Sequence, residues 1–431
     1  MYWDTSNHVR EEIAITHFKF LHAADLHLDS PLLGLTSKSP AFAAKVEAAS
    51  RKAFDDLIDL AISERCRFVV LAGDIFDGDL RNYQAGLFFI SGLRRLLEAG
   101  IDVFMILGNH DAENRIVSKL GYSKNVHVFS AKGAETRLLE DVGVAVHGQS
   151  FSQRDVTENL AQGYPPAHAG YFNVGVLHTA CEGQEGPHAR YAPCSVEQLV
   201  NHGYDYWALG HVHDRAVLHE FPHVVYPGNL QGRSPRETGS KGAHVIGVQE
   251  GRISSLEHRS LDTVRWSHAR LDVSDATDLP EIVLLIKEQI ELAYEEAEQR
   301  AVAVRVTLAG ATALHHEIQL AGSFLREELD AVCASISDDV WLERIVVATK
   351  APAAPAVLDA SLAGLIQQQL SSVAVHRVAE VLEKRLAEVA AKMPANARFG
   401  ELAERIRENA AGRILDLANA LITKDEADAV R

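Results

Sequence analysis

The stretch 101-IDVFMILGNHDA-112 places Asn, His and Asp directly after a run of apolar residues. The run 101–107 has the length and composition of a buried β-strand. Asn109 and His110 then need hydrogen-bond partners, water or a ligand, because an unpaired polar group is costly to bury. An earlier stretch, 67-RFVVLAGDIFD-77, has the same form and ends in carboxylates. The sequence therefore predicts buried strands whose ends carry reactive polar side chains.

Predicted strands and helices alternate through about the first 265 residues. Helical spacing of apolar residues indicates helices at 39–64, 82–100 and 195–203, the last capped by Ser195. Apolar runs indicate strands at 18–25, 67–74, 101–111, 142–149, 171–178, 204–211, 223–229 and 242–249. This order is typical of an α/β fold with right-handed crossovers and helices on the faces of the sheet. In such sheets, ligands gather at the carboxyl ends of the strands.

The pattern changes after this first domain, residues 1–265. Residues 266–350 read as strand, helix, strand, helix, strand, which predicts a small α/β domain. The segment 351-APAAPA-356 resembles a linker. Two Ala- and Leu-rich helices are predicted beyond it, at 357–392 and 401–422, so residues 351–431 form a third, helical region.

Composition narrows the class of protein. The chain has 431 residues and a formal charge of −17, which argues against a protein that coats nucleic acid by bulk electrostatics. An enzyme with a local basic groove, metal ions or a partner remains compatible with that charge. No apolar run is long enough to span a membrane, and the N-terminal residues lack the form of a signal peptide. Four cysteines without CxxC spacing fit a reducing compartment, so we expect a cytoplasmic protein.

Five predicted strand ends carry side chains that could bind metal or move protons. They are Asp25, His27, Asp74, Asn109, His110, His178, His211 and His213. Each alone is a weak signal, since Asp is common in turns and a single His is more often structural. Together they supply carboxylate, amide and imidazole donors without thiolate, a set that suits Mn, Fe or Zn. Two metals, with one Asp bridging them, would let the site hydrolyse a phosphate ester by generating hydroxide at neutral pH.

The motif order DLH, GDIFD, GNHD, LHT and GHVH resembles the calcineurin-like metallophosphoesterase superfamily. The stretches 22-HAADLHLDSPLLGL-35 and 203–242 resemble, more narrowly, DNA repair exonucleases of the SbcD/YhaO type. The resemblance implies a four-layer sandwich of two mixed sheets flanked by helices. It also implies a small α/β capping domain and C-terminal helices.

The resemblance assigns roles to the polar strand ends. One metal would be held by Asp25, His27, Asp74 and His213. The other would be held by Asp74, Asn109, His178 and His211, so that Asp74 bridges the two. His110 would face the scissile phosphate and protonate the leaving 3′-oxygen, and Asp111 would orient its ring.

Some acidic and loop residues keep two interpretations. By the same resemblance, archaeal and eukaryotic members of the family have a His three residues after the bridging Asp, where this chain has Asp77 and bacterial members tolerate Asp. For Asp77, Asp29 and Asp79, a capping or solvated carboxylate is the simpler interpretation. The turn 226-YPGN-229 and Arg233 would line a DNA groove by resemblance, with Asn229 and Arg233 binding substrate. A plain hairpin turn explains the same sequence nearly as well.

The resemblance predicts a dimetal-dependent DNA nuclease, most simply a DNA repair exonuclease that uses Mn²⁺. The C-terminal helices would dock an SMC-like ATPase of the SbcC/YhaN type, and homodimerisation is a further family expectation. Two alternatives remain open at this point. One is a phosphodiesterase or phosphatase acting on small molecules, and the other is a catalytically silent scaffold that binds DNA ends.

Overall fold

The structure is a computed structural model that describes residues 17–30, 40–77, 83–112, 114, 120–183, 191–352 and 384. The chain divides into two compact units. The first comprises residues 1–267 and 297–303, and the second comprises 268–296 and 304–431. The predicted C-terminal helices at 357–392 and 401–422, and Asp79, lie outside the described residues.

The first unit contains two six-stranded sheets. The order of the first sheet is β12-β11-β1-β2-β3-β4. Its strands are β1 (Phe18–Ala23), β2 (Phe68–Ala72), β3 (Asp102–Ile106), β4 (Val126–Val128), β11 (Gly242–Gln249) and β12 (Arg252–Ser260). Strands β1 to β4 run parallel, whereas β11 and β12 are antiparallel to their neighbours. The mixed sheet agrees with the prediction, although its two edge strands, β4 and β12, were not among the predicted strands.

The second sheet has the order β5-β6-β7-β8-β10-β9. Its strands are β5 (Glu135–Leu139), β6 (Val144–Gly148), β7 (Phe172–His178), β8 (Tyr206–Gly210), β9 (Ala216–Glu220) and β10 (His223–Tyr226). Strands β6, β7, β8 and β10 are parallel. The outer strands β5 and β9 are antiparallel to β6 and β10, so this sheet is also mixed.

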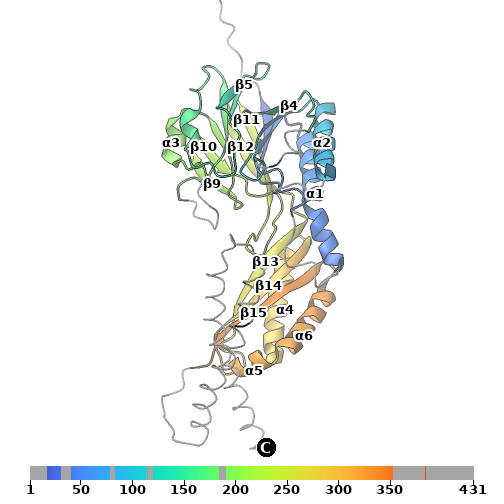
Figure 1. Ribbon diagram of the computed structural model, residues 1–431. Coiled ribbons are helices and arrows are strands. Elements are labelled where there is room, and N and C mark those ends of the chain that lie inside the picture. The colour runs from blue at the N-terminus through green and yellow to red at the C-terminus, as the bar shows by residue number, and fades with distance from the viewer. Residues whose placement is uncertain are drawn as a thin grey trace, which may run out of the picture. The chain divides into compact units, whose positions relative to one another are not determined.

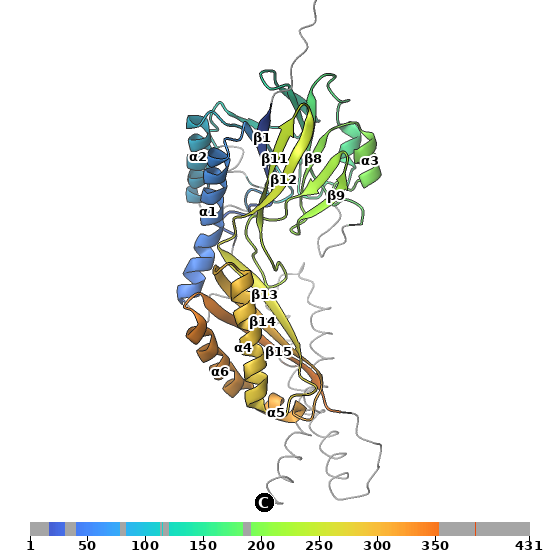
Figure 2. The same cartoon turned by 180° about the vertical axis from the view of Figure 1, so that it is seen from behind.

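Three apolar cores separate four layers. Helices α1 (Pro40–Ser63) and α2 (Tyr83–Glu98) pack on the outer face of the first sheet through residues such as Phe54 and Phe89. Phenylalanines and Tyr206 fill the space between the two sheets. The short helix α3 (Val196–Asn201) covers the outer face of the second sheet beside Trp207. Figure 1 and Figure 2 show α1 and α2 on one side of the sheets and α3 on the other. The predicted four-layer sandwich is confirmed.

Parallel pairing brings the carboxyl ends of the central strands together. In the first sheet Ala72 of β2 pairs with Ile106 of β3. In the second sheet His178 of β7 pairs with Gly210 of β8. The loops that follow these strands therefore all lie at one edge of the sandwich, and the predicted metal ligands lie in these loops or at the strand ends.

A third sheet has the order β13-β14-β15. It is formed by β13 (Val264–Asp272), β14 (Ala301–Ala311) and β15 (Val340–Lys350) and is accompanied by α4 (Leu279–Glu296), α5 (His315–Leu320) and α6 (Gly322–Ile336). Ile286 of α4 and Leu329 of α6 are fully buried. The predicted order of strands and helices is present, with α5 as an additional short helix. Among the described residues, no helix has the length and apolarity needed to cross a bilayer.

Candidate dimetal centre

The backbone at the strand ends is bent into a conformation that side chains rarely adopt. Asp25, His27, Asp74 and His211 all have positive φ, from 43° at His27 to 101° at His211. This left-handed region costs a non-glycine residue on the order of 1–2 kcal/mol. Hydrogen bonds between loops hold it: the amide of Asp25 donates to the Gly73 carbonyl, and that of His27 donates to the Asp74 carbonyl, both at 3.0 Å. The bends let consecutive loop residues direct their side chains toward one centre.

Glycine allows the loop after β3 to approach the loop after β2. A Cβ at Gly108 would lie 2.2 Å from Oδ1 of Asp74, well inside any permitted contact. The same oxygen accepts a hydrogen bond from the His110 amide at 3.0 Å. The "GNHD" sequence therefore needs its first residue to be glycine so that Asp74 can be held against this turn.

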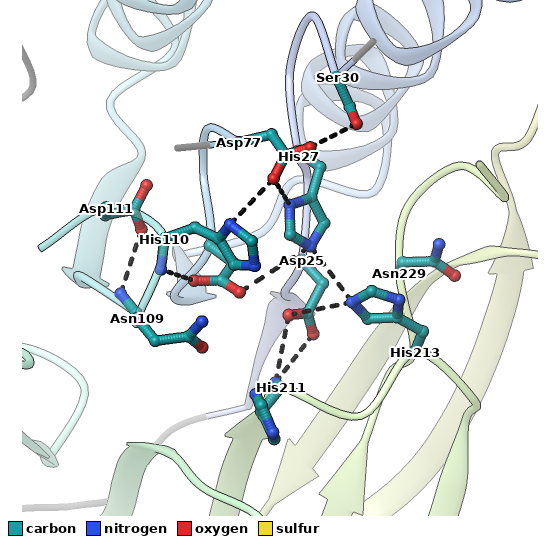
Figure 3. Close-up of polar contacts among 12 residues, drawn as sticks. Asp25, His27, Ser30, Asp77, Asn109, His110, Asp111, His211, His213 and Asn229 are labelled. Atoms are coloured by element: carbon teal, nitrogen blue, oxygen red, sulfur yellow. Dashed lines mark hydrogen bonds and ion pairs between the residues drawn. The ribbon is translucent and has the colours of Figure 1, made fainter. Parts of the chain in front are cut away.

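One group of candidate ligands comprises Asp25, His27 and His213, all of which are buried. Nε2 of His213 lies 3.2 Å from Nε2 of His27 and 3.9 Å from Oδ1 of Asp25. Both carboxylate oxygens of Asp25 also accept the amide hydrogen of His211, at 3.0 and 3.2 Å. Figure 3 shows the rings of His27 and His213 directed toward each other, with the carboxylate of Asp25 beside them.

A second group comprises Asp74, His178 and His211, also buried. Asn109 joins this group, because its Oδ1 lies 3.0 Å from Nε2 of His178. Oδ2 of Asp74 lies 3.5 Å from Nε2 of His178 and 3.9 Å from Nε2 of His27. One oxygen of Asp74 thus faces histidines from both groups, as a bridging ligand must.

The potential ligand atoms of this group are hydrogen-bond acceptors that face one another, an arrangement that suits a bound cation. Nδ1 of His178 lies 2.9 Å from the carbonyl of Ala72, so it carries the hydrogen and leaves Nε2 with a lone pair in the neutral ring. That lone pair would face the oxygens of Asn109 and Asp74, which are acceptors as well. Three acceptors around one point require a shared proton or a cation.

The pKa shifts of His178 and Asp74 are also consistent with a site that needs a positive charge at this point. Burial by itself lowers the pKa of His178, but the carboxylate of Asp74 outweighs it and raises that pKa to about 9. Burial opposes ionisation of Asp74, yet the charges of His178 and His27 hold its pKa well below the usual value. A divalent ion could replace the proton on His178, because metal ligands must be deprotonated. The residues present therefore fit two divalent ions.

His110 lies beside this cluster and is only partly buried, with 27% of its side chain exposed. Its Nδ1 lies 2.9 Å from Oδ1 of Asp77, and the hydroxyl of Ser30 donates to Oδ2 of Asp77 at 2.7 Å. Figure 3 shows Asp77 between the rings of His27 and His110. Burial alone would lower the pKa of His110, but the hydrogen bond to Asp77 and the charges of Asp74 and Asp77 together leave it raised.

The prediction that Asp111 orients the His110 ring is wrong. The carboxylate of Asp111 instead accepts three backbone N–H groups, from Ile75, Phe76 and Gly108, at 3.0 to 3.1 Å. It therefore fastens the loop after β2 to the loop after β3. Asp77, for which the simpler interpretation was a capping or solvated carboxylate, is the residue that contacts the ring. Asp29, the other described residue in that group, pairs with Arg51.

The two predicted substrate-binding residues lie in different environments. Asn229 is fully buried, and its amide donates to the Gln231 carbonyl and to Glu237, each at 2.9 Å. It does not line a groove, because its side chain has no exposed surface. Arg233 keeps 20% of its side chain exposed and lies 3.3 Å from Asp77. Its predicted contact with substrate stays a prediction.

Sequence reasoning missed Glu237. Its Oε1 accepts a hydrogen bond from Nδ1 of His213 at 2.9 Å. Burial by itself raises the pKa of Glu237, but this hydrogen bond, the charges of His213 and Arg233 and the Arg233 backbone N–H together lower it to about 2. Glu237 lies in the irregular segment between β10 and β11, inside the stretch 203–242 that carries the family resemblance, but no spacing to another polar residue singled it out.

Two family descriptions match the chain. Residues 18–215 match the calcineurin-like phosphoesterases, and residues 266–350 match the middle domain of metallophosphoesterase YhaO. A Bacillus subtilis protein described as uncharacterized metallophosphoesterase YhaO is 34% identical over 360 residues. That match covers 82% of this chain and 87% of the relative. The chain belongs to the YhaO family of calcineurin-like metallophosphoesterases. The suspected resemblance is confirmed at the level of the family.

More distant relatives are described as DNA double-strand break repair protein Mre11. The protein from Methanopyrus kandleri is 24% identical over 278 residues, covering 58% of this chain and 57% of the relative. The one from Thermoplasma acidophilum is 24% identical over 266 residues, covering 57% of this chain and 66% of the relative. The chain thus spans less than two thirds of either relative. Family membership and the ligand groups together support a phosphoester hydrolase that uses two divalent metals.

Proposed function

We propose that this YhaO-family protein is a dimetal-dependent DNA nuclease that hydrolyses phosphodiester bonds and acts as a DNA repair exonuclease. The observation that carries the proposal is the position of Asp74, whose Oδ2 lies within 4 Å of histidines from both ligand groups. The names of the Mre11 relatives, which describe DNA double-strand break repair, favour DNA over other phosphodiesters.

The ligand set favours Mn²⁺ among the divalent ions, with Fe or Zn as alternatives. The donors are carboxylates, imidazoles and one amide, without thiolate, which is the mixture that borderline divalent ions accept. When bound, two such ions would acidify a water molecule, neutralise charge on the phosphoryl oxygens and stabilise the leaving oxygen.

The chain's own acid would be His110. Its Nδ1 faces Asp77, so the proton available to a substrate is on Nε2 of the imidazolium. The raised pKa keeps this ring protonated to higher pH than an ordinary histidine, which suits protonation of a leaving 3′-oxygen. The partial exposure of His110, in contrast to the buried ligands, leaves it open to a substrate.

We further propose that an SMC-like ATPase of the SbcC/YhaN type is the partner and that the segments 357–392 and 401–422, which the sequence predicts to be helical, dock it. A chain with a formal charge of −17 holds DNA poorly by itself, so affinity for DNA would come largely from that partner. Free, buried cysteines fit work in the reducing cytoplasm. Co-purification with such an ATPase should be lost when residues 357–431 are deleted, and retention would refute the docking role.

Two substrates assayed side by side test the nuclease proposal. The protein is incubated with Mn²⁺ and either an end-labelled DNA duplex or bis-p-nitrophenyl phosphate. Both should be hydrolysed, and EDTA should abolish both activities. Hydrolysis of the small ester alone would overturn the nuclease proposal in favour of a small-molecule phosphodiesterase. Binding of DNA ends with no hydrolysis of either substrate would favour the scaffold.

A further inference from the structure

Glu237 has three hydrogen-bond donors around one carboxylate. Besides Nδ1 of His213, it accepts the side-chain amide of Asn229 at 2.9 Å and the backbone N–H of Arg233 at 2.6 Å. Only 15% of its side chain is exposed. The carboxylate is therefore held in one orientation by its own loop, and His213 is bound to a fixed acceptor.

The guanidinium of Arg233 continues the network from Glu237 to Asp77. One nitrogen lies 3.9 Å from Oε1 of Glu237. Another lies 3.3 Å from Oδ2 of Asp77 and 3.4 Å from the hydroxyl of Ser30. Arg233 thus separates two carboxylates that would otherwise repel each other, and each of them holds a histidine of the site.

We propose that Glu237 and Arg233 are positioning residues that connect the metal ligand His213 to the acid His110. Glu237 keeps the hydrogen of His213 on Nδ1 and so directs the Nε2 lone pair at the cation site. Arg233 fixes the carboxylates of Glu237 and Asp77 relative to each other. The inference rests on the proposed dimetal chemistry of the centre, but it assigns to Arg233 a role inside the protein rather than on the DNA.

Titration of the metal-free protein with Mn²⁺ tests the role of Glu237 without any substrate. The ions retained after dialysis at low Mn²⁺ are counted, and the affinity of each site is measured by calorimetry. In Glu237→Ala one of the two ions should bind about 10- to 100-fold more weakly, the loss typical of a ligand's hydrogen-bond partner. The ion held by Asn109, His178 and His211 should keep its affinity.

Two further variants test whether an effect of Glu237→Ala comes from lost positioning of His213, from the loss of a nearby negative charge, or from a folding defect. Asp214→Asn removes a carboxylate adjacent to His213 in sequence, but that side chain is 82% exposed and pairs with Lys241. Mn²⁺ affinity should change less than about threefold in Asp214→Asn, because exposed charges are well screened. Glu237→Gln retains an oxygen that can accept from His213 and should lose less affinity than Glu237→Ala. It decides the question if the alanine variant fails to fold.

Arg233 is tested by its coupling to Glu237. Arg233→Met should weaken the same Mn²⁺ site several-fold, whereas Arg233→Lys, which keeps the charge, should weaken it less. In the double variant Glu237→Gln with Arg233→Met, the loss should be smaller than the product of the single losses, because both changes disrupt one network. Strictly multiplicative losses would show that Arg233 acts independently of Glu237 and would overturn its assigned role.

The outcomes distinguish this inference from the proposed function. If the wild-type protein binds two Mn²⁺ ions but cleaves no DNA, the nuclease proposal fails and the positioning roles remain. If Glu237→Ala lowers the melting temperature but binds both ions with unchanged affinity, Glu237 merely supports its loop. That result would overturn the inference whatever the substrate of the enzyme.

Discussion

Two histidines on adjacent strands of the second sheet, His147 on β6 and His178 on β7, show what distinguishes a ligand from a structural residue. Both are buried, with 1% and 0% exposure, and each lies near the end of an apolar strand. Yet their pKa values move in opposite directions. Burial lowers the pKa of His147 to about 4, whereas the pKa of His178 rises to about 9.

The difference lies in the neighbours. His147 contacts the hydroxyl of Thr136 at 2.8 Å and the amide oxygen of Asn173 at 3.0 Å, which are neutral groups that satisfy a neutral ring. His178 faces Asp74, whose negative charge outweighs the cost of burial. A buried histidine that faces a carboxylate, such as His178, is therefore a candidate metal ligand, whereas one with neutral partners, such as His147, is satisfied as a core residue.

Removal of the Asp74 carboxylate, which His178 faces and His147 does not, should have the largest effect on activity. Asp74→Asn should lower hydrolysis of bis-p-nitrophenyl phosphate by at least about 10⁴-fold, because two metal functions worth several kcal/mol each would be lost together. Metal analysis should find fewer than two ions per chain. A variant that keeps both ions and a tenth of the activity would show that Asp74 is not shared between them.

Loss of His110 should leave the metal cluster intact but remove its acid. His110→Asn should slow cleavage of DNA by about 10³-fold, within the range for a general acid. It should slow cleavage of bis-p-nitrophenyl phosphate much less, because p-nitrophenolate leaves without protonation. Asp77→Asn should give the same pattern, but weaker, because Asp77 acts through the ring. Equal losses on both substrates would contradict the assignment of an acid.

A matched pair of substitutions compares the two histidines directly. His178→Gln should weaken Mn²⁺ binding at one site by at least about 100-fold, since a ligand matters no less than its hydrogen-bond partners. His147→Gln should leave both sites unchanged, which calorimetric titration of the two variants would measure. If the His147 variant also lost an ion, the distinction drawn from their neighbours would fail.

The smallest effect concerns acid stability. The folded pKa of His147, about 4, lies below its ordinary value of 6.5, so its contribution is complete above pH 6.5 and declines as the pH falls toward 4. Between pH 6.5 and 5 this loss is about 2 kcal/mol. Denaturant unfolding of the wild type and His147→Gln across this range should show a steeper decline in the wild type. Parallel curves would mean that His147 is not held neutral by burial.

The sequence predicted most members of the candidate ligand groups because these residues follow apolar runs. Asp25, Asp74 and His178 lie at or just beyond the ends of parallel strands, and parallel pairing brings such ends together. The alternation of strands and helices predicted an α/β fold, whereas the four-layer sandwich was expected from the family resemblance. Residues at the carboxyl ends of parallel strands could be predicted to lie together because both the apolar runs and the strand topology place them at the same edge of a sheet.

The residues that support the cluster could not be assigned in the same way. Asp77, Arg233 and Glu237 come from irregular loops and meet only in the folded chain, so no spacing joins them. Asp111 adjoins His110 in sequence, but the turn directs its carboxylate to backbone amides. Asn229 was assigned to a DNA groove by resemblance, whereas the hydrogen bonds to Gln231 and Glu237 hold it inside.

The left-handed backbone at His27 and His211 has an evolutionary consequence. A residue with a Cβ is sterically strained in that conformation, whereas glycine adopts it without steric strain. Each ligand thus lowers the stability of the fold that carries it. A descendant relieved of selection for catalysis should accumulate glycine first at these positions, gaining a firmer fold as it loses its metals.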